Sequence, residues 1–343
     1  MNDRFLRACR REPVDATPVW FMRQAGRYME DYRALRRRYS LLDICANPEL
    51  AVAVTLQPLD LIDVDAAILF SDLLVPFTPM GLDFDFVKGE GPSIKNPIRC
   101  AHDVDRLRPF EPRESLGHVL ETIRILRTEL VARVPLIGFG GAPFTLAAYA
   151  IEGGPSTNYA RTKAFMYSEP AAWHRLCARF ATTMADYMKA QIEAGAQAVQ
   201  IFDSWAGSLG RSDYREFALP HTAHILSALK SSGVPIIHFG VGTTAILRDL
   251  AEAGGDVIGV DWRQPLDEAW AVIGHERGIQ GNMDPTLLLG PEERMFAVAD
   301  DILRRAAGRP GHIFNLGHGV LPSTSIERVQ ALAKHVHEFK TEG

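Results

Sequence analysis

The 343-residue chain is poor in cysteine and carries no excess of positive charge. Its few cysteines lie far apart, with no Cys-x-x-Cys pair, at Cys9, Cys45, Cys100 and Cys177. This spacing is atypical of a disulfide framework, so we expect the protein to work in a reducing compartment. The formal net charge is -5. A chain of this charge has no global basic field to attract nucleic acid or an anionic membrane, and we expect neither as a partner.

Long hydrophobic runs are also scarce. Residues 134–151 form an uncharged stretch, but Pro135, Pro143 and three glycines interrupt it. A strand, a tight turn and the start of a buried helix explain this stretch better than a membrane span. The first fifteen residues are charged and lack an apolar segment, so we expect no signal peptide. With 47% hydrophobic and 23% charged residues, the composition excludes a disordered chain.

Short apolar runs rich in Val, Ile and Phe recur along the chain, and each ends in glycine or a polar residue. Segments with helical spacing lie between them, a pattern typical of a parallel sheet covered on both faces. Eight such runs predict an α/β fold, a (β/α)₈ TIM barrel, with a doubly wound open sheet as the alternative. The expected strands are 19–22, 66–70, 136–139, 198–202, 235–239, 257–260, 278–281 and 312–315.

The segments between the runs predict helices and one insertion. Residues 170–195, 243–253 and 291–306 have apolar residues three and four apart and end at or near glycine. The segment 73–114 is longer than a barrel loop requires. Its length predicts an insertion after the second strand, with a hairpin of its own. No Ser- or Pro-rich linker divides the chain, so residues 1–343 are expected to form a single domain.

Reactive groups in a barrel gather where the strands end. The first run ends in Arg23 and Gln24, with Arg27 close behind, and the second ends in Asp72. Gly26 lets the backbone turn tightly, and two guanidiniums beside it can clamp carboxylates. Helix capping is a simpler role for Asp72, and the pattern leaves both roles open. Later positions that complete the set are Tyr149, Ser204, His238, Asp261, Asn282, Asp284 and His318.

These strand-end residues predict a site for a polyanionic ligand with acid–base or electrostatic chemistry. A protein-bound metal is not expected. His238 and His318 stand in plausible positions, but neither has a cysteine or carboxylate at ligand spacing.

Several longer strings resemble the signatures of one family, uroporphyrinogen decarboxylase, in the family's order and with matching gaps. They are PVWFMRQAGRYM at 18–29, FSDLL at 70–74, GFGGAPFTLAAYAIEGG at 138–154, QGNMDP at 280–285 and FNLGHGV at 314–320. The resemblance covers nearly the whole chain. It implies a (β/α)₈ barrel, a cytoplasmic homodimer, and a role in porphyrin and haem biosynthesis. The implied reaction removes the carboxyls of four acetates from uroporphyrinogen III, giving coproporphyrinogen III, without any cofactor.

The resemblance also implies roles for individual residues. Asp72 in FSD is similar to the family's central carboxylate, which binds the pyrrole N–H groups. Arg23 and Arg36 are the implied partners of Asp72 in catalysis and the two candidates for the proton path, between which the sequence does not choose. The implied substrate-binding residues are Arg23, Gln24, Arg27, Asp72, Tyr149, Ser204 and His318.

This chemistry suits these residue types. Loss of CO₂ from an acetate leaves an electron pair that needs a sink, and a pyrrole protonated at its α-carbon supplies one. The protein must then stabilise positive charge on the ring, which a buried carboxylate does. The eight carboxylates of the substrate explain local arginines in a net-acidic chain.

Two departures from the family pattern affect loop shape rather than these groups. Met29, Glu30 and Asp31 replace a Leu-Pro-Glu run, which leaves the placement of Arg36 open, and Phe144 stands where tryptophan is common.

Two other functions remain as alternatives. A zinc-dependent methyltransferase wants a His-x-Cys pair, but residues 238–240 read His-Phe-Gly. A tetrapyrrole carrier on the same fold would bind porphyrinogen and release no CO₂.

Overall fold

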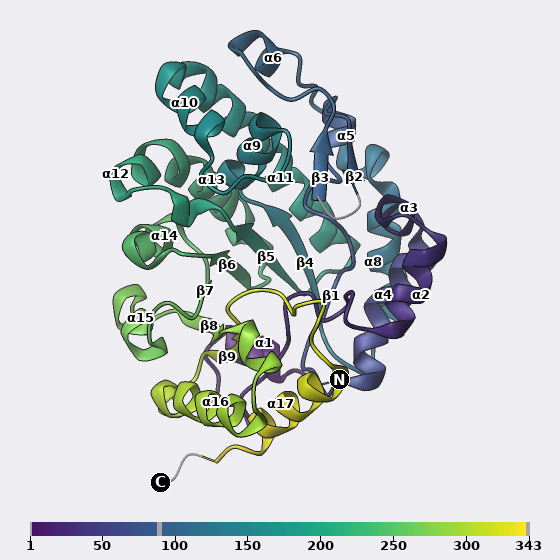
Figure 1. Cartoon of the computed structure of the whole chain (residues 1–343), viewed down its shortest axis with the longest axis vertical. Coiled ribbons are helices and arrows are strands. Elements are labelled where there is room, and N and C mark those ends of the chain that lie inside the picture. Colours follow the sequence, from purple (N-terminus) through teal and green to yellow (C-terminus); the bar gives the residue numbers. More distant parts are fainter. Residues whose placement is uncertain (1, 88–90, 341–343) are drawn as a thin grey trace.

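The computed structural model describes residues 2–87 and 91–340; residues 1, 88–90 and 341–343 of the expected single domain lie outside the described residues. The described core is a parallel seven-stranded sheet that curls, with helices around its outside (Figure 1). Neighbouring strands in this sheet follow their order along the chain. A doubly wound sheet would reverse the strand order at a switch point, so the expected alternative of a doubly wound sheet is wrong. The strands are β1 Ala67–Ile68, β4 Leu136–Gly141, β5 Ala198–Asp203, β6 Ile236–Gly240, β7 Val257–Gly259, β8 Gly278–Met283 and β9 His312–Leu316.

Most of the helices bury one face against the sheet or against one another, whereas the short α12 buries no residue. In the longest, α11, the apolar residues expected to line one face, among them Trp173, Phe180 and Met184, are buried. The α-helices are α1 Arg4–Cys9, α2 Glu30–Arg38, α3 Leu41–Ala46, α4 Pro48–Leu61, α5 Phe77–Met80, α6 Ala101–Asp105, α7 Pro112–Ser115, α8 Gly117–Glu129, α9 Pro143–Glu152, α10 Ala160–Ser168, α11 Pro170–Ala194, α12 Arg211–Asp213, α13 Leu219–Leu229, α14 Leu247–Ala253, α15 Leu266–Ile273, α16 Glu292–Ala306 and α17 Ile326–Glu338.

The expected strand 19–22 is wrong as a regular strand. Only Val19 forms a bridge, to Phe314 of β9, although the segment lies between β9 and β1. Side chains take the place of ladder partners along it. The backbone N–H groups of Val19, Phe21 and Met22 donate to side-chain oxygens of Asp65, Gln24 and Asn315.

Two expected elements are shorter than their apolar patterns. β1 stops at Ile68 because the Phe70 N–H donates to the Thr55 hydroxyl on α4, 3.0 Å away, and so leaves the sheet. The helix expected at 243–253 begins as a 3₁₀ turn and becomes α-helical only at Leu247. Between β1 and β4, residues 73–114 do hold the expected hairpin, an antiparallel pair of β2 Phe84–Val87 and β3 Gly91–Ile94.

Helix α1 packs against the inner face of the curled sheet. Phe5, Leu6 and Cys9 belong to one buried cluster with inward-facing strand residues such as Ile137 and Ile237. Nothing among the described helices is long and apolar enough to cross a membrane, and the stretch 134–151 folds as β4 and α9.

A buried carboxylate, Asp65, ties both ends of the described chain to the sheet. Its Oδ1 accepts from Asn2 (2.6 Å) and Arg4 (2.7 Å), and its Oδ2 accepts from the Val19 N–H and from His337 on α17, both at 2.7 Å. Burial works to raise the pKa of Asp65, but these donors outweigh burial and lower it. Asp65 lies just before β1, at the end of the sheet away from the strand-end residues, where stability rather than chemistry is expected.

Candidate active site

Arg23 occupies the centre of the candidate site in an unusual backbone conformation. Its φ is 60°, in the left-handed region that few non-glycine residues adopt. Backbone strain of this kind gathers at functional sites. The base of its side chain lies directly on Gly319, where an added Cβ would stand 2.4 Å from the Arg23 Cδ. Gly319 therefore makes room for the Arg23 side chain.

Asp72 is a half-buried carboxylate close to Arg23. Its Oδ1 accepts the Leu74 N–H at 2.9 Å, so it caps a tight turn and not an α-helix. Burial raises the pKa of Asp72, and the Leu74 N–H and the positive charge of Arg23 partly oppose that rise. The site thus holds a partly desolvated carboxylate within electrostatic range of a cation, and such a carboxylate, when ionised, stabilises positive charge on a ligand.

Tyr149 and His318 complete this group around Arg23. Burial and the nearby Asp72 raise the pKa of Tyr149 to about 12, with Arg23 acting against them. Burial and the charge of Arg23 lower the pKa of His318 to about 4, so its imidazole is neutral near pH 7. Because its Nδ1 accepts the Gly319 N–H at 2.7 Å, the proton of the neutral ring is assigned to Nε2. His318 therefore offers an N–H donor without a charge.

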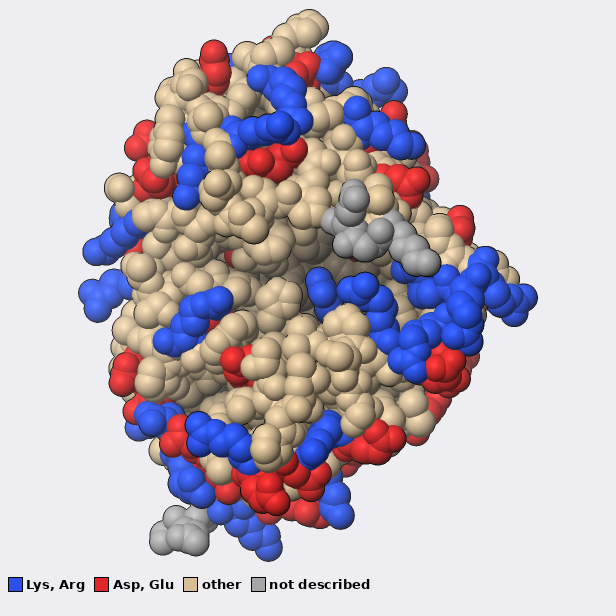
Figure 2. All heavy atoms as spheres, in the orientation of Figure 1, with Lys and Arg blue, Asp and Glu red and all other residues tan. Residues whose placement is uncertain are grey.

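The other predicted residues from the first loop fall into different environments. Gln24 is buried, and its amide is engaged by the Phe21 N–H and the Ala66 carbonyl, at 3.1 and 3.0 Å. These two bonds hold the loop in place, and the side chain is buried away from the surface. Arg27 is exposed. Figure 2 shows Lys and Arg side chains on two sides of a hollow over the sheet.

Arg36 lies beside Tyr32 on α2, with its Nη1 3.4 Å from the tyrosine hydroxyl. Its Nε is buried and has no hydrogen-bond partner within residues 2–87 and 91–340. Burial and Asp72 raise the pKa of the Cys45 thiol and Arg36 lowers it, whereas the arginine that acts on the pKa of Asp72 itself is Arg23.

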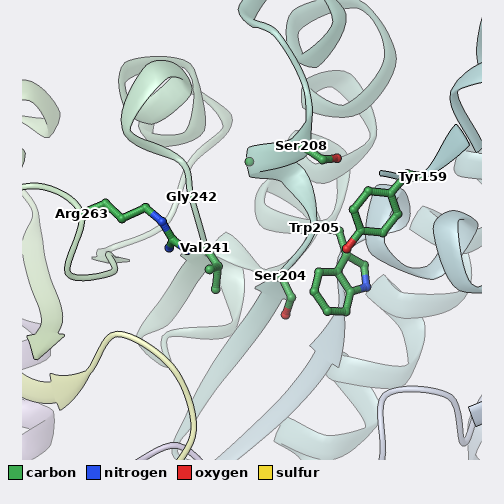
Figure 3. A pocket seen from close by; sticks show the side chains of 8 residues that line it. Tyr159, Ser204, Trp205, Ser208, Val241, Gly242 and Arg263 are labelled. Carbon is green, nitrogen blue, oxygen red and sulfur yellow. The ribbon is translucent and has the colours of Figure 1, made fainter. Parts of the chain in front are cut away.

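Ser204 lines a cavity of about 380 Å³ beside this group (Figure 3). Tyr149 reaches the same region, because its ring lies 5.8 Å from that of Trp205. The cavity is lined by Tyr159, Ser204, Trp205, Gly207, Ser208, Val241, Gly242 and Arg263. Apart from Ser204, none of these was predicted from the sequence. Arg263 follows the strand-end Asp261 by two residues, so a search extended slightly beyond each strand end finds it.

His238 is not part of this site. It is fully buried, its Nε2 lies 3.9 Å from Asp203 Oδ2, and it lies on the opposite face of β6 from the inward-facing Ile237 and Phe239. In the part of the chain that the structure describes, no three His, Cys, Asp or Glu side chains gather in a way that would hold a metal ion.

The contact between Gly319 and Arg23 gives a first test of the site. Gly319→Ala would force Arg23 out of its position, because the new Cβ would overlap three of its side-chain carbons. We expect kcat/KM for the substrate that the sequence resemblance implies to fall by about tenfold or more while the melting temperature changes little. Gly210→Ala is the matched control, since nothing lies within 4 Å of a Cβ at that position. Equal activity of the two variants would contradict the placement of Arg23.

Comparison with known proteins identifies the family. The family model described as Uroporphyrinogen decarboxylase (URO-D) matches residues 1–339. The chain belongs to the uroporphyrinogen decarboxylase family. It is 56% identical to the uroporphyrinogen decarboxylase of Sorangium cellulosum over 99% of this chain and 97% of that protein. It is 53% identical to that of Carboxydothermus hydrogenoformans, again over 99% and 97%.

A solved structure supports the fold. A methyltransferase from Methanosarcina mazei aligns with 98% of both chains at a TM-score of 0.78. At 23% identity, this similarity shows a shared fold and nothing about function.

Proposed function

We propose that the chain removes the carboxyl groups of the four acetate side chains of uroporphyrinogen III, giving coproporphyrinogen III in tetrapyrrole biosynthesis. Full-length similarity to uroporphyrinogen decarboxylases supports this reaction. The observation that carries it is Asp72, a half-buried carboxylate whose pKa is raised by burial and lowered in part by the charge of nearby Arg23. The face shown in Figure 2 also has a hollow with Lys and Arg side chains on two sides. Such a site combines stabilisation of positive charge with binding of a polyanion.

The proposed chemistry needs no cofactor. A proton adds to the pyrrole α-carbon, the C–C bond to the carboxylate breaks, and its electron pair enters the cationic ring as CO₂ leaves. A second proton then converts the exocyclic methylene to a methyl group while the ring loses the first proton. Asp72 faces the ring N–H groups and stabilises the cation, an electrostatic contribution that enzymes make with preorganised groups. Arg23 and Arg36 remain the two candidates for delivering the proton.

The remaining residues bind and position the substrate. Arg23 and Arg27 bind substrate carboxylates, while Tyr149, Ser204 and the Nε2–H of His318 supply hydrogen bonds to the substrate. Gln24 acts by fixing the loop that carries the two arginines, since its own amide is engaged by backbone groups.

We further propose that the chain is a single-domain, cytoplasmic homodimer. Segment 19–22 acts as the eighth strand and closes the sheet into a (β/α)₈ barrel, with residues 73–114 as an insertion. Backbone hydrogen bonds from Phe314 to Pro18 (2.8 Å) and from Asp65 to Val19 (2.7 Å) support the closure. Light scattering that finds only monomer would refute the dimer.

The pH dependence tests whether Asp72 works as a carboxylate. Because Arg23 lowers the pKa of Asp72, removing the positive charge in Arg23→Met raises that pKa further. The acid limb of kcat/KM for uroporphyrinogen should then move to higher pH, and Arg23→Lys should move it less. An acid limb at the same pH in all three proteins would show that Asp72 ionisation does not control it.

The reaction itself is tested by anaerobic incubation of the purified protein with uroporphyrinogen III in the presence of a chelator. The products are oxidised to porphyrins and their masses followed with time. Stepwise loss of four CO₂ units without added cofactor is expected. Unchanged substrate that nevertheless binds would identify a carrier, and substrate that neither reacts nor binds would reject the proposal.

A further inference from the structure

Arg263 is an arginine held rigidly at the cavity beside Ser204. Its backbone N–H and its Nη1 both donate to the carboxylate of Asp261, which also accepts the Gly242 N–H at 2.6 Å. The guanidinium lies over the Trp262 ring, 4.6 Å from its centroid. Asp261 is almost fully buried, whereas about half of the Arg263 side chain is exposed. The arginine is fixed on one side and open on the other.

We propose that Arg263 binds a peripheral carboxylate of the substrate and does so from a different loop than the one that carries Arg23 and Arg27. This inference rests on the proposed function and adds a specificity-determining residue to it. A guanidinium has five donors, and Asp261 occupies only part of them, so the remaining N–H groups can hold a second carboxylate.

The position of Arg263 supports this assignment. Figure 3 shows it extending from one side of the cavity toward Val241 and Gly242, with Trp205 and Tyr159 on the other side and Ser204 between. Arg23 and Arg263 are both close enough to His318 to lower the pKa of its imidazole. His318 thus lies within range of two arginines that come from different loops. A macrocycle with carboxylates on every side needs cations at more than one edge.

The cavity wall beside Arg263 is closely packed, and one of its side-chain hydroxyls has no hydrogen-bond partner among the described residues. A Cβ at Gly207 would stand 2.2 Å from the Val241 carbonyl oxygen, so glycine is required where these two loops meet. The next residue, Ser208, lines the cavity, and its buried hydroxyl has no hydrogen-bond partner in the described part of the chain. Lys163 donates to the Ser208 carbonyl at 2.6 Å and holds this segment from outside the cavity lining. The unpaired Ser208 hydroxyl can therefore donate to an anionic group that Arg263 binds.

The test uses Arg263→Gln in the full chain, with two readouts. The first is the separation of KM from kcat with uroporphyrinogen. The second is binding of two non-reacting oxidised porphyrins, uroporphyrin III and coproporphyrin III, followed by quenching of tryptophan fluorescence. We expect KM and the uroporphyrin Kd to rise by about tenfold, the effect of losing one charge-assisted hydrogen bond at a half-exposed site, with kcat nearly unchanged.

The two porphyrins distinguish which carboxylate Arg263 holds. An equal loss of affinity for both porphyrins assigns a propionate, which both carry. A loss confined to uroporphyrin assigns an acetate. Arg294→Gln makes the same change of charge at an exposed position of α16 that does not line the cavity, and it should match the parent protein.

The outcomes separate this inference from the proposed function. An inactive parent protein that binds neither porphyrin would reject the proposed function. An active parent protein with unchanged KM and porphyrin binding in Arg263→Gln would reject the role of Arg263 alone. A lower melting temperature with unchanged KM would show that Arg263 only stabilises its loop through Asp261.

Discussion

Asp72→Asn should reduce kcat for uroporphyrinogen by about 10²-fold or more while leaving the fold intact. The asparagine side chain keeps an oxygen that accepts the Leu74 N–H, so the turn that Asp72 caps is retained. What is lost is the negative charge that stabilises the cationic pyrrole, and removal of one preorganised electrostatic group has effects of this size. The measurement is steady-state turnover under anaerobic conditions, with circular dichroism and thermal melting to verify folding.

The matched control is Asp43→Asn, which alters an exposed aspartate whose carboxylate likewise accepts one backbone N–H, that of the α3 N-cap residue Ser40. Its turnover should equal that of the parent protein. Uroporphyrin binding should weaken much less than turnover in Asp72→Asn, because the porphyrin carries no cationic transition state. Near-normal turnover by Asp72→Asn would contradict the central role of this carboxylate.

Asp65→Asn should destabilise the protein by about 3 kcal/mol or more without altering the chemistry of the site. Asp65 is fully buried and accepts from Asn2, Arg4, the Val19 N–H and His337. Removing one partner of a buried ion pair leaves the other charge uncompensated, and such losses amount to about 3–5 kcal/mol. For a chain of this length we expect the melting temperature to fall by about 4–7 °C.

Asp63→Asn is the control, because Asp63 also contacts His337, at 3.2 Å, but its side chain is 82% exposed. Asp63→Asn should lower the free energy of unfolding by less than about 1 kcal/mol.

The His337 contact adds a pH test. Although burial opposes it, hydrogen bonding to Asp65 raises the pKa of His337, so its stabilising contribution is complete below the ordinary histidine pKa and is lost at higher pH. His337→Gln should therefore destabilise more at pH 6 than at pH 9.

The sheet was largely predictable because its strands are buried on both faces and their sequences are nearly continuous apolar runs. β4, β5 and β9 each appear within one or two residues of their expected limits. Segment 19–22 has the same apolar character, but its pairing depends on Asp65, Gln24 and Asn315. Asp65 and Asn315 are distant in sequence from this segment, and Gln24 resembles a site residue. Apolar periodicity therefore does not indicate that side chains replace the backbone hydrogen bonds of a sheet there.

The site was predictable where a residue directly follows a strand and less so elsewhere. Arg23, Asp72 and His318 are brought close together, as their positions at strand ends suggested. The engagement of the Gln24 amide by the backbone depends on a carbonyl 42 positions away and leaves no local pattern. Arg263 stands two residues beyond its strand end, and its fixed orientation arises from Asp261 and Trp262.

The pairing of the first segment with β9 bears on how the chain folds as it is made. The Met22 N–H donates to Asn315, 293 positions later. At ~5–20 residues per second, a ribosome takes roughly 15–60 s to synthesise the intervening chain. During that interval the N-terminal segment and the inner face of the growing sheet lack their partner strand. The nascent chain should therefore be a substrate for chaperones until residues near 315 emerge from the exit tunnel.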